Sequence, residues 1–205
     1  MAESLMGVFS RVSAFTVVFL LFFFLMESLR VGSLNINGGR DRNKRGLINE
    51  LIHAKHLDVV FLQETHSTED NVVDWGMSWE GQHFHGHDTN LSAGVAILFA
   101  PRLSMTDVSF SQVERGRVII VQATIKNMPF TFINVYAYSS GTKRVTLFNA
   151  LRSILEQYVN NSMVVIGGDW NCTDPLKGDR IGEEPHPQSA SVLTSVVTQH
   201  GLKDT

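Results

Sequence analysis

The sequence predicts an α/β fold of the four-layer sandwich type, in which two packed mixed β-sheets are flanked by helices. Strand-like and helix-like segments alternate from Leu29 onward, and several strand-like segments follow one another at spacings short enough for hairpins. Hydrophobic residues make up 43% of the 205 residues and charged residues 18%, which supplies a sizeable core for one domain.

Five segments have the composition of strands. In residues 117–125, every second residue from position 119 to position 125 is apolar, as in a strand that buries one face. Residues 93–100 and 130–138 are also strand-like. The short runs 58–62 and 163–166 are apolar throughout, which predicts strands buried on both faces.

Three segments place apolar side chains at helical spacing: residues 43–56, 143–159 and 189–200. Gly201 follows the last of them and suits the end of a helix, because glycine adopts the left-handed conformation that often terminates helices. The apolar stripes of all three helices are interpreted as core.

The formal net charge is −3, so the domain as a whole does not attract nucleic acid, and affinity for phosphates requires a local basic patch. The chain has a single cysteine, Cys172, which excludes an internal disulfide and a metal site built from several cysteines. A reducing compartment is therefore expected.

The N-terminal residues 1–26 differ in composition from the rest of the chain. Residues 14–26 form a nearly unbroken apolar run after Arg11, short for a membrane span and without a small-residue cleavage site. One interpretation is an uncleaved anchor or poor signal giving weak membrane association; the other is a non-native leader upstream of a start near Met26. We therefore divide the chain into this extension and one domain, residues 27–205.

Four of the predicted strands end in polar side chains. The first, a sixth strand-like segment at residues 29–37, ends in Asn35 and Asn37; the next runs into Glu64, a third ends through Tyr136, and the last ends in Asp169 and Asn171. Because alternate residues of a strand point the same way, Asp169 and Asn171 would face one target. If the four strand ends meet at one edge, they form a polar cluster on a rigid scaffold.

The residue types in this cluster indicate a particular chemistry. Two carboxylates with amide oxygens, and neither histidine nor cysteine, favour Mg²⁺ over zinc, with Mn²⁺ able to take its place. The second carboxylate can then orient and deprotonate an attacking water. Amides and a phenol donate hydrogen bonds to phosphate oxygens, so the set fits hydrolysis of a phosphoester.

The motifs LNING (residues 34–38), LQETH (62–66), NVYAY (134–138) and GGDWN (167–171) occur in this order. Together they resemble the endonuclease/exonuclease/phosphatase superfamily, the group of exonuclease III and the apurinic/apyrimidinic (AP) endonucleases. The wording is most similar to the endonuclease domain of non-LTR (LINE-type) retrotransposons. The resemblance covers residues 29–205.

The resemblance implies a role for each polar residue at the strand ends. Glu64 would be the principal metal-binding carboxylate, with Asn35 beside the metal. Tyr136 would contact the scissile phosphate, and Asp169 would orient or activate the nucleophilic water. Asn171 would hold the phosphate and the surrounding network.

Other charged residues receive separate interpretations. Arg40 is the best candidate in the basic cluster 40–45 for contact with the DNA phosphate backbone, the alternative being a solvated face. Arg115 and Arg117 flank a predicted turn and are interpreted as solvated, and the histidine tract 83–87 as a loop. No obligate protein partner is inferred.

The sequence departs from the family pattern in two places. NVYAY has Tyr138 where the family usually has proline, which leaves the implied role of Tyr136 unchanged. The family's closing Ser-Asp-His, whose histidine stabilises the transition state, is absent, since none of the eight histidines follows a Ser-Asp pair. We expect a domain that is incomplete at its C-terminus, and inactive or impaired as given.

The resemblance implies a magnesium-dependent DNA endonuclease or nickase in the nucleus. Target-primed retrotransposition is the closest role, and an AP endonuclease of DNA repair is the second. Two alternatives stay open: a catalytically inactive remnant tethered to a membrane through residues 14–26, and a phosphatase acting on a sugar or lipid phosphate.

Overall fold

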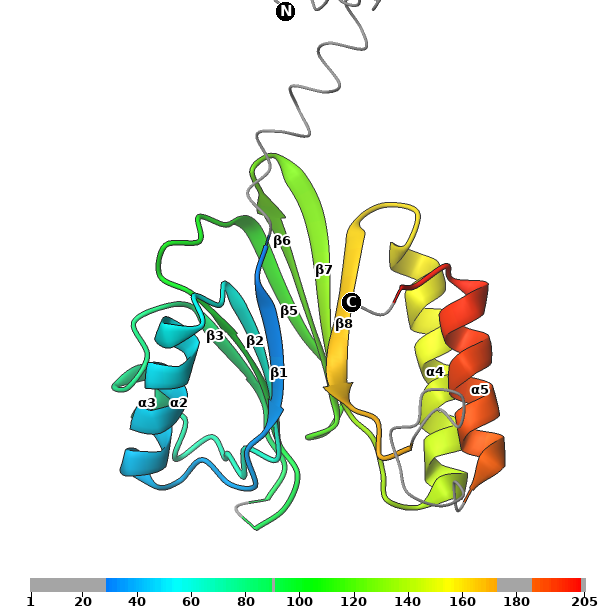
Figure 1. The fold of residues 1–205 in the computed structure, drawn as a ribbon, viewed down its shortest axis with the longest axis horizontal. Helices are drawn as coiled ribbons and strands as arrows, with labels where there is room; N and C mark the ends of the chain where they lie inside the picture. The colour runs from blue at the N-terminus through cyan, green and yellow to red at the C-terminus, as the bar shows by residue number, and fades with distance from the viewer. Residues whose placement is uncertain (1–28, 90, 173–185, 204–205) are drawn as a thin grey trace, which may run out of the picture.

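The computed structural model describes residues 29–89, 91–172 and 186–203, which form an α/β sandwich of four layers (Figure 1). Two four-stranded sheets lie in the middle, one pair of helices lies beside the first sheet, and a second pair lies beside the other. The predicted fold class is confirmed. The extension 1–26 lies outside the described residues, and no helix in the described ranges has the length and apolar character of a membrane span.

The first sheet has the strand order β1-β2-β4-β3. Its strands are β1 (Val31–Asn35), β2 (Val59–Gln63), β3 (His83–Gly86) and β4 (Val95–Phe99). β1 and β2 are parallel, and β4 is antiparallel to both of its neighbours. β2 and β4 are buried along their whole length because they occupy the centre of the sheet.

The second sheet has the order β5-β6-β7-β8. Its strands are β5 (Thr106–Glu114), β6 (Val118–Ile125), β7 (Met128–Tyr136) and β8 (Met163–Asp169). β5, β6 and β7 form an antiparallel meander, whereas β8 is parallel to β7. Each sheet therefore contains one parallel pair, β1–β2 and β7–β8.

Helices form the long crossover connections that the parallel strands require. α2 (Arg42–Ala54) joins β1 to β2, and α4 (Gly141–Tyr158) joins β7 to β8. The short α3 (Val73–Gly76) follows β2, and α5 (Pro187–Gln199) packs against α4. The three predicted helices are thus confirmed, with ends that differ from the predicted ones by one or two residues.

Three apolar clusters fill the spaces between the four layers. One cluster lies between the sheets, where Phe61, Phe99 and Phe132 are fully buried and the rings of Phe99 and Phe132 meet edge to face at 5.2 Å. A second cluster joins the second sheet to α4 and α5, and a third joins the first sheet to α2 and α3. These layers hold the strands, and therefore their ends, in fixed positions.

Two expectations about strands are wrong, and one strand was not predicted. The tract 83–87, interpreted as a loop, is mostly strand β3, because its residues pair with β4. β5 has no counterpart among the predicted strands, since its residues are almost all exposed and lack a buried apolar face. β8 is only half-buried, with Met163 47% exposed, because among the described residues it pairs on one side alone.

Candidate active site

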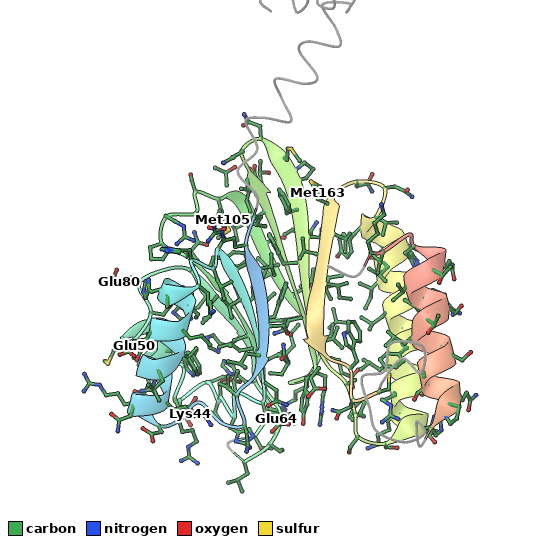
Figure 2. All side chains as sticks on the ribbon, viewed as in Figure 1. Lys44, Glu50, Glu64, Glu80, Met105 and Met163 are labelled. Atoms are coloured by element: carbon green, nitrogen blue, oxygen red, sulfur yellow. The ribbon has the colours of Figure 1, made fainter. Side chains whose placement is uncertain are left out.

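The four polar strand ends meet at one end of the sandwich. In the two parallel pairs, Asn35 lies beside Gln63 and Tyr136 lies beside Asp169. β1 and β8 are close neighbours across the two sheets, and their ends point to the same side in Figure 1. Figure 2 shows Glu64 at this end of the molecule. The structure therefore brings together all five residues that the sequence singled out there.

The side chain of Asn35 connects the two carboxylates of the cluster. Its Nδ2 donates one hydrogen bond to Oε1 of Glu64 and another to Oδ2 of Asp169, both 2.9 Å long. The hydroxyl of Tyr136 also donates to Oε1 of Glu64, at 2.7 Å. Two carboxylates from different sheets are thus held within reach of a single amide group.

Asn171 lies beside Asp169 and fixes its second oxygen. The backbone N–H of Asn171 donates to Oδ1 of Asp169 at 3.0 Å, while its Nδ2 donates to the carbonyl oxygen of Ala137 at 2.8 Å. Both oxygens of Asp169 therefore accept hydrogen bonds within the cluster. The same contacts attach the end of β8 to the end of β7.

Left-handed backbone conformations gather in this region. Asn37, Glu64 and Asn171 have φ angles of 44°, 53° and 48°. Asparagine adopts this conformation readily, but glutamate does so rarely, at an energetic cost. Glu64 turns away from the direction of β2 at this point, which carries its carboxylate to Asn35 and Tyr136.

The surroundings shift the pKa of Glu64 and that of Tyr136 in opposite directions. Burial raises the pKa of Glu64, but the hydrogen bonds from Asn35 and Tyr136 and the nearby positive charges of His66 and Arg117 outweigh it, so the pKa lies below its ordinary value. Burial and the bond to the Glu64 carboxylate raise the pKa of Tyr136 to about 12. At neutral pH the pair is a carboxylate and a protonated phenol.

Two buried polar side chains support the cluster from beneath. Asn134, fully buried, donates through Nδ2 to the carbonyl oxygens of Leu62 and Ala96, at 2.9 and 2.8 Å. Its Oδ1 accepts from Nε2 of Gln63 at 2.8 Å. Asn134 belongs to the second sheet and its three partners to the first, so these bonds join the two sheets directly below the active-site residues.

Two buried arginines hold the loops that follow β1 and β7. Arg45 donates from Nη1 to the carbonyl oxygens of Gly39 and Arg40, at 3.0 and 2.7 Å. Arg144 donates in the same way to those of Tyr138 and Ser139, at 3.3 and 2.8 Å. Each arginine is the fourth residue of its helix.

Arg40 and Arg45, two arginines of the basic cluster 40–45, differ in exposure. Arg45 is buried and serves the loop, whereas Arg40 lies exposed in the segment between β1 and α2. An external anion can therefore reach Arg40 but not Arg45.

Arg117 is a residue whose environment the sequence interpretation missed. Its guanidinium carbon lies 4.4 Å from the ring centre of Tyr136 and 4.5 Å from that of Tyr138, so it is stacked instead of solvated. The tight β6–β7 hairpin places it there, because the N–H of Tyr136 donates to the carbonyl oxygen of Arg117. In a hairpin whose turn lies at positions 126–127, residue 117 lies opposite residue 136, so the sequence alone could have indicated that Arg117 and Tyr136 are cross-strand neighbours.

His83 and His85 of β3 contact each other edge to face, and His85 is buried. His85 is 8% exposed, and its ring lies 5.2 Å from that of His83 and 5.5 Å from that of Trp75. Neither ring nitrogen of His85 has a hydrogen-bond partner among the described residues. Burial, followed by the charges of His83 and His87, lowers the pKa of His85 to about 3.

This buried histidine predicts acid sensitivity. His85 stays neutral when folded but gains a proton below pH 6.5 when unfolded, so the free energy of unfolding falls as the pH drops from 6.5 towards 3. Between pH 7 and pH 5 the loss from His85 is about 2 kcal/mol. Urea unfolding at both pH values measures how far the free energy of unfolding falls between pH 7 and pH 5. In His85→Phe this fall should be smaller than in the parent chain by about 2 kcal/mol. In the exposed control His56→Gln it should equal that of the parent chain. Equal pH dependence in all three proteins would contradict the assignment.

The donor set fits a hard divalent cation. Glu64 and Asp169 supply two carboxylates, which matches the one or two carboxylates by which proteins commonly hold Mg²⁺, and Nδ2 of Asn35 lies beside both as a hydrogen-bond donor. Within residues 29–89, 91–172 and 186–203, no three histidine, cysteine, aspartate or glutamate side chains are grouped closely enough to hold a metal ion by themselves. A structural zinc site, with four protein ligands, does not fit this part of the chain.

Comparison with known proteins identifies the family. Residues 32–187 match the model of the Endonuclease/Exonuclease/phosphatase family, and the chain belongs to this family. It is 29% identical over 177 residues to the transposon TX1 uncharacterized 149 kDa protein of Xenopus laevis. That match covers 86% of this chain but spans 14% of the relative's length. The resemblance recognised from the four motifs is confirmed.

Solved structures share the fold. An AP endonuclease from Archaeoglobus fulgidus has a TM-score of 0.60 at 18% identity, covering 84% of this chain and 71% of that one. A humanized D. rerio TDP2 with 14 mutations has a TM-score of 0.55 at 17% identity, covering 84% and 66%. TDP2 from C. elegans has 0.55 at 16%, covering 88% and 60%.

Proposed function

We propose that this protein hydrolyses phosphodiester bonds in DNA with the help of Mg²⁺, or of Mn²⁺ in its place, as an endonuclease that nicks one strand. The observation that carries the proposal is the bridge from Asn35 to both Glu64 and Asp169, which holds two carboxylates of different sheets together. Membership of the family supports hydrolase chemistry, and the similarity to the transposon TX1 protein supports a role in retrotransposition in the nucleus.

Glu64 would hold the metal, with Asn35 beside it. Oε1 of Glu64 already accepts hydrogen bonds from Asn35 and Tyr136, which fixes the carboxylate and directs Oε2 away from these donors. A bound divalent cation would neutralise charge on the phosphate and stabilise the charge that develops in the transition state. The low pKa of Glu64 keeps it ionised throughout the neutral range.

Asp169 would act on the attacking water, whereas Tyr136 and Arg40 would contact the substrate. Hydrogen bonds from Asn35 and Asn171 orient the Asp169 carboxylate, which would take a proton from the water. The Tyr136 phenol, with a pKa of about 12, would donate a hydrogen bond to a phosphate oxygen without losing its proton. Arg40, exposed after β1, would contact the DNA backbone.

The test is nicking of supercoiled plasmid, with protein in excess so that a slow reaction is also measured. Nicking should require Mg²⁺ and stop on chelation. Glu64→Gln should raise the Mg²⁺ concentration for half-maximal rate by at least the about 10–100-fold typical of residues that support metal ligands. Isothermal titration with Mn²⁺ should show the same loss of affinity.

The matched control is Glu50→Gln, on the exposed face of α2, which should leave both the Mg²⁺ requirement and Mn²⁺ binding unchanged (Figure 2). Nicking that persists in excess chelator, or Mn²⁺ binding that is equal in Glu64→Gln and the parent chain, would contradict the proposed function.

A further inference from the structure

Four side chains form a series of alternating aromatic rings and cations beside the candidate active site. Arg117 lies between the rings of Tyr136 and Tyr138, at 4.4 and 4.5 Å. Nζ of Lys143 lies 5.3 Å from the ring centre of Tyr138 and extends the series. We refer to Tyr136, Arg117, Tyr138 and Lys143 as the tyrosine–cation series.

The series leads away from the carboxylates to the surface. Tyr136 donates its hydroxyl hydrogen bond to Glu64, so the first ring belongs to the site itself. Arg117 and Tyr138 are half-buried, and Lys143, in the first turn of α4, is exposed. A substrate strand whose reacting phosphate lies at Tyr136 would meet the other members next.

The two cations of the series are available to an anion. In the described part of the chain neither Arg117 nor Lys143 forms an ion pair, whereas Arg102 and Arg115 each pair with an aspartate. The guanidinium of Arg117 carries five N–H donors, and its hydrogen bond to the carbonyl oxygen of Ala137 is long, at 3.4 Å. Stacking on the rings stabilises both charges, and Arg117 also acts at longer range on the Glu64 carboxylate, whose pKa it lowers.

We propose that the tyrosine–cation series binds the phosphodiester backbone of the DNA strand beside the scissile phosphate. Arg117 and Lys143 contact the phosphates, and Tyr138 keeps the two cations in position. The proposal rests on the proposed function for the identity of the substrate. Cations that follow a strand and aromatic rings that offer flat faces are together the surface by which proteins hold nucleic-acid strands.

Glu114 acts against this binding and provides a test of opposite sign. The hydroxyl of Tyr138 donates to Oε1 of Glu114 at 2.6 Å, which fixes the ring but brings a negative charge beside the series. Removing that charge should favour an anion, whereas removing the charge of Lys143 should oppose it.

The experiment measures DNA binding separately from cleavage. Fluorescence anisotropy of a labelled oligonucleotide duplex, titrated in EDTA at several salt concentrations, gives the Kd and its salt dependence. Lys143→Gln should raise the Kd and reduce the slope of log K against log salt by about 1. Arg117→Lys, which keeps the charge but loses the stacked guanidinium plane, should raise the Kd with little change in slope. Glu114→Gln should lower the Kd.

Lys55→Gln is the matched control, an exposed lysine at the end of α2 remote from the strand ends. A Kd and a slope in Lys143→Gln equal to those of the control, or no DNA binding at low salt, would overturn the proposal. The two proposals fail separately. If nicking does not depend on metal but the variants change the Kd for DNA as expected, only the proposed function is wrong. If nicking depends on metal but the variants leave the Kd unchanged, only the role of the tyrosine–cation series is wrong.

Discussion

Replacing Asp169 by asparagine is expected to lower the nicking rate by about 10²–10⁴-fold, and saturating Mg²⁺ should not restore it. The amide keeps the size of the carboxylate and can still accept from the N–H of Asn171, but it cannot take a proton from water. More cation does not supply a missing base. Initial rates of plasmid nicking, measured over a series of Mg²⁺ concentrations, separate this defect from weak metal binding.

Glu64→Gln provides the contrast, because its rate should recover in part as Mg²⁺ rises. Asp70→Asn, at an exposed position in the segment between β2 and α3, is the matched control and should nick as the parent chain does. If Asp169→Asn retains the parent rate, or if high Mg²⁺ rescues it, Asp169 is not the group that activates the water.

Replacing Asn134 by leucine is expected to reduce the free energy of unfolding by about 3 kcal/mol or more. Leucine has a similar volume, but it removes the two donors that reach the carbonyl oxygens of Leu62 and Ala96 and the acceptor that Gln63 uses. Each buried polar group left without its partner costs about 1–3 kcal/mol. Urea or guanidinium unfolding followed by far-ultraviolet circular dichroism measures the change.

The control for Asn134 is Asn161→Ala, which removes one exposed side-chain hydrogen bond to the carbonyl oxygen of Gln157 and should cost less than about 1 kcal/mol. A loss in Asn134→Leu no larger than that of the control would show that the buried bonds between the sheets contribute little to stability.

The positions of the proposed site residues were predictable because they follow from parallel pairing. Strands that run parallel end at the same edge of a sheet, so β1 with β2 and β7 with β8 bring Asn35, Glu64, Tyr136 and Asp169 to one side. The polar residues after apolar runs therefore identified this edge before the structure was known. The functions of these residues stay predictions.

Features that depend on contacts between distant segments were not predictable. The stacking of Arg117 requires the register of the β6–β7 hairpin, and Glu114 meets Tyr138 only because β5 pairs beside it. β3 was missed because its histidines look polar in sequence, although packing on Trp75 buries His85. Local composition does not contain such tertiary contacts.

The bond between Asn35 and Asp169 joins residues 134 positions apart in the chain. Contacts of such long range close only after the segments between them have been brought together, so they tend to form late in folding. During synthesis the ribosome releases Glu64 about a hundred residues before Asp169, and at 5–20 residues per second the second carboxylate follows by roughly 5–20 seconds. The nascent chain therefore carries no assembled pair of carboxylates until β8 has been made and docked.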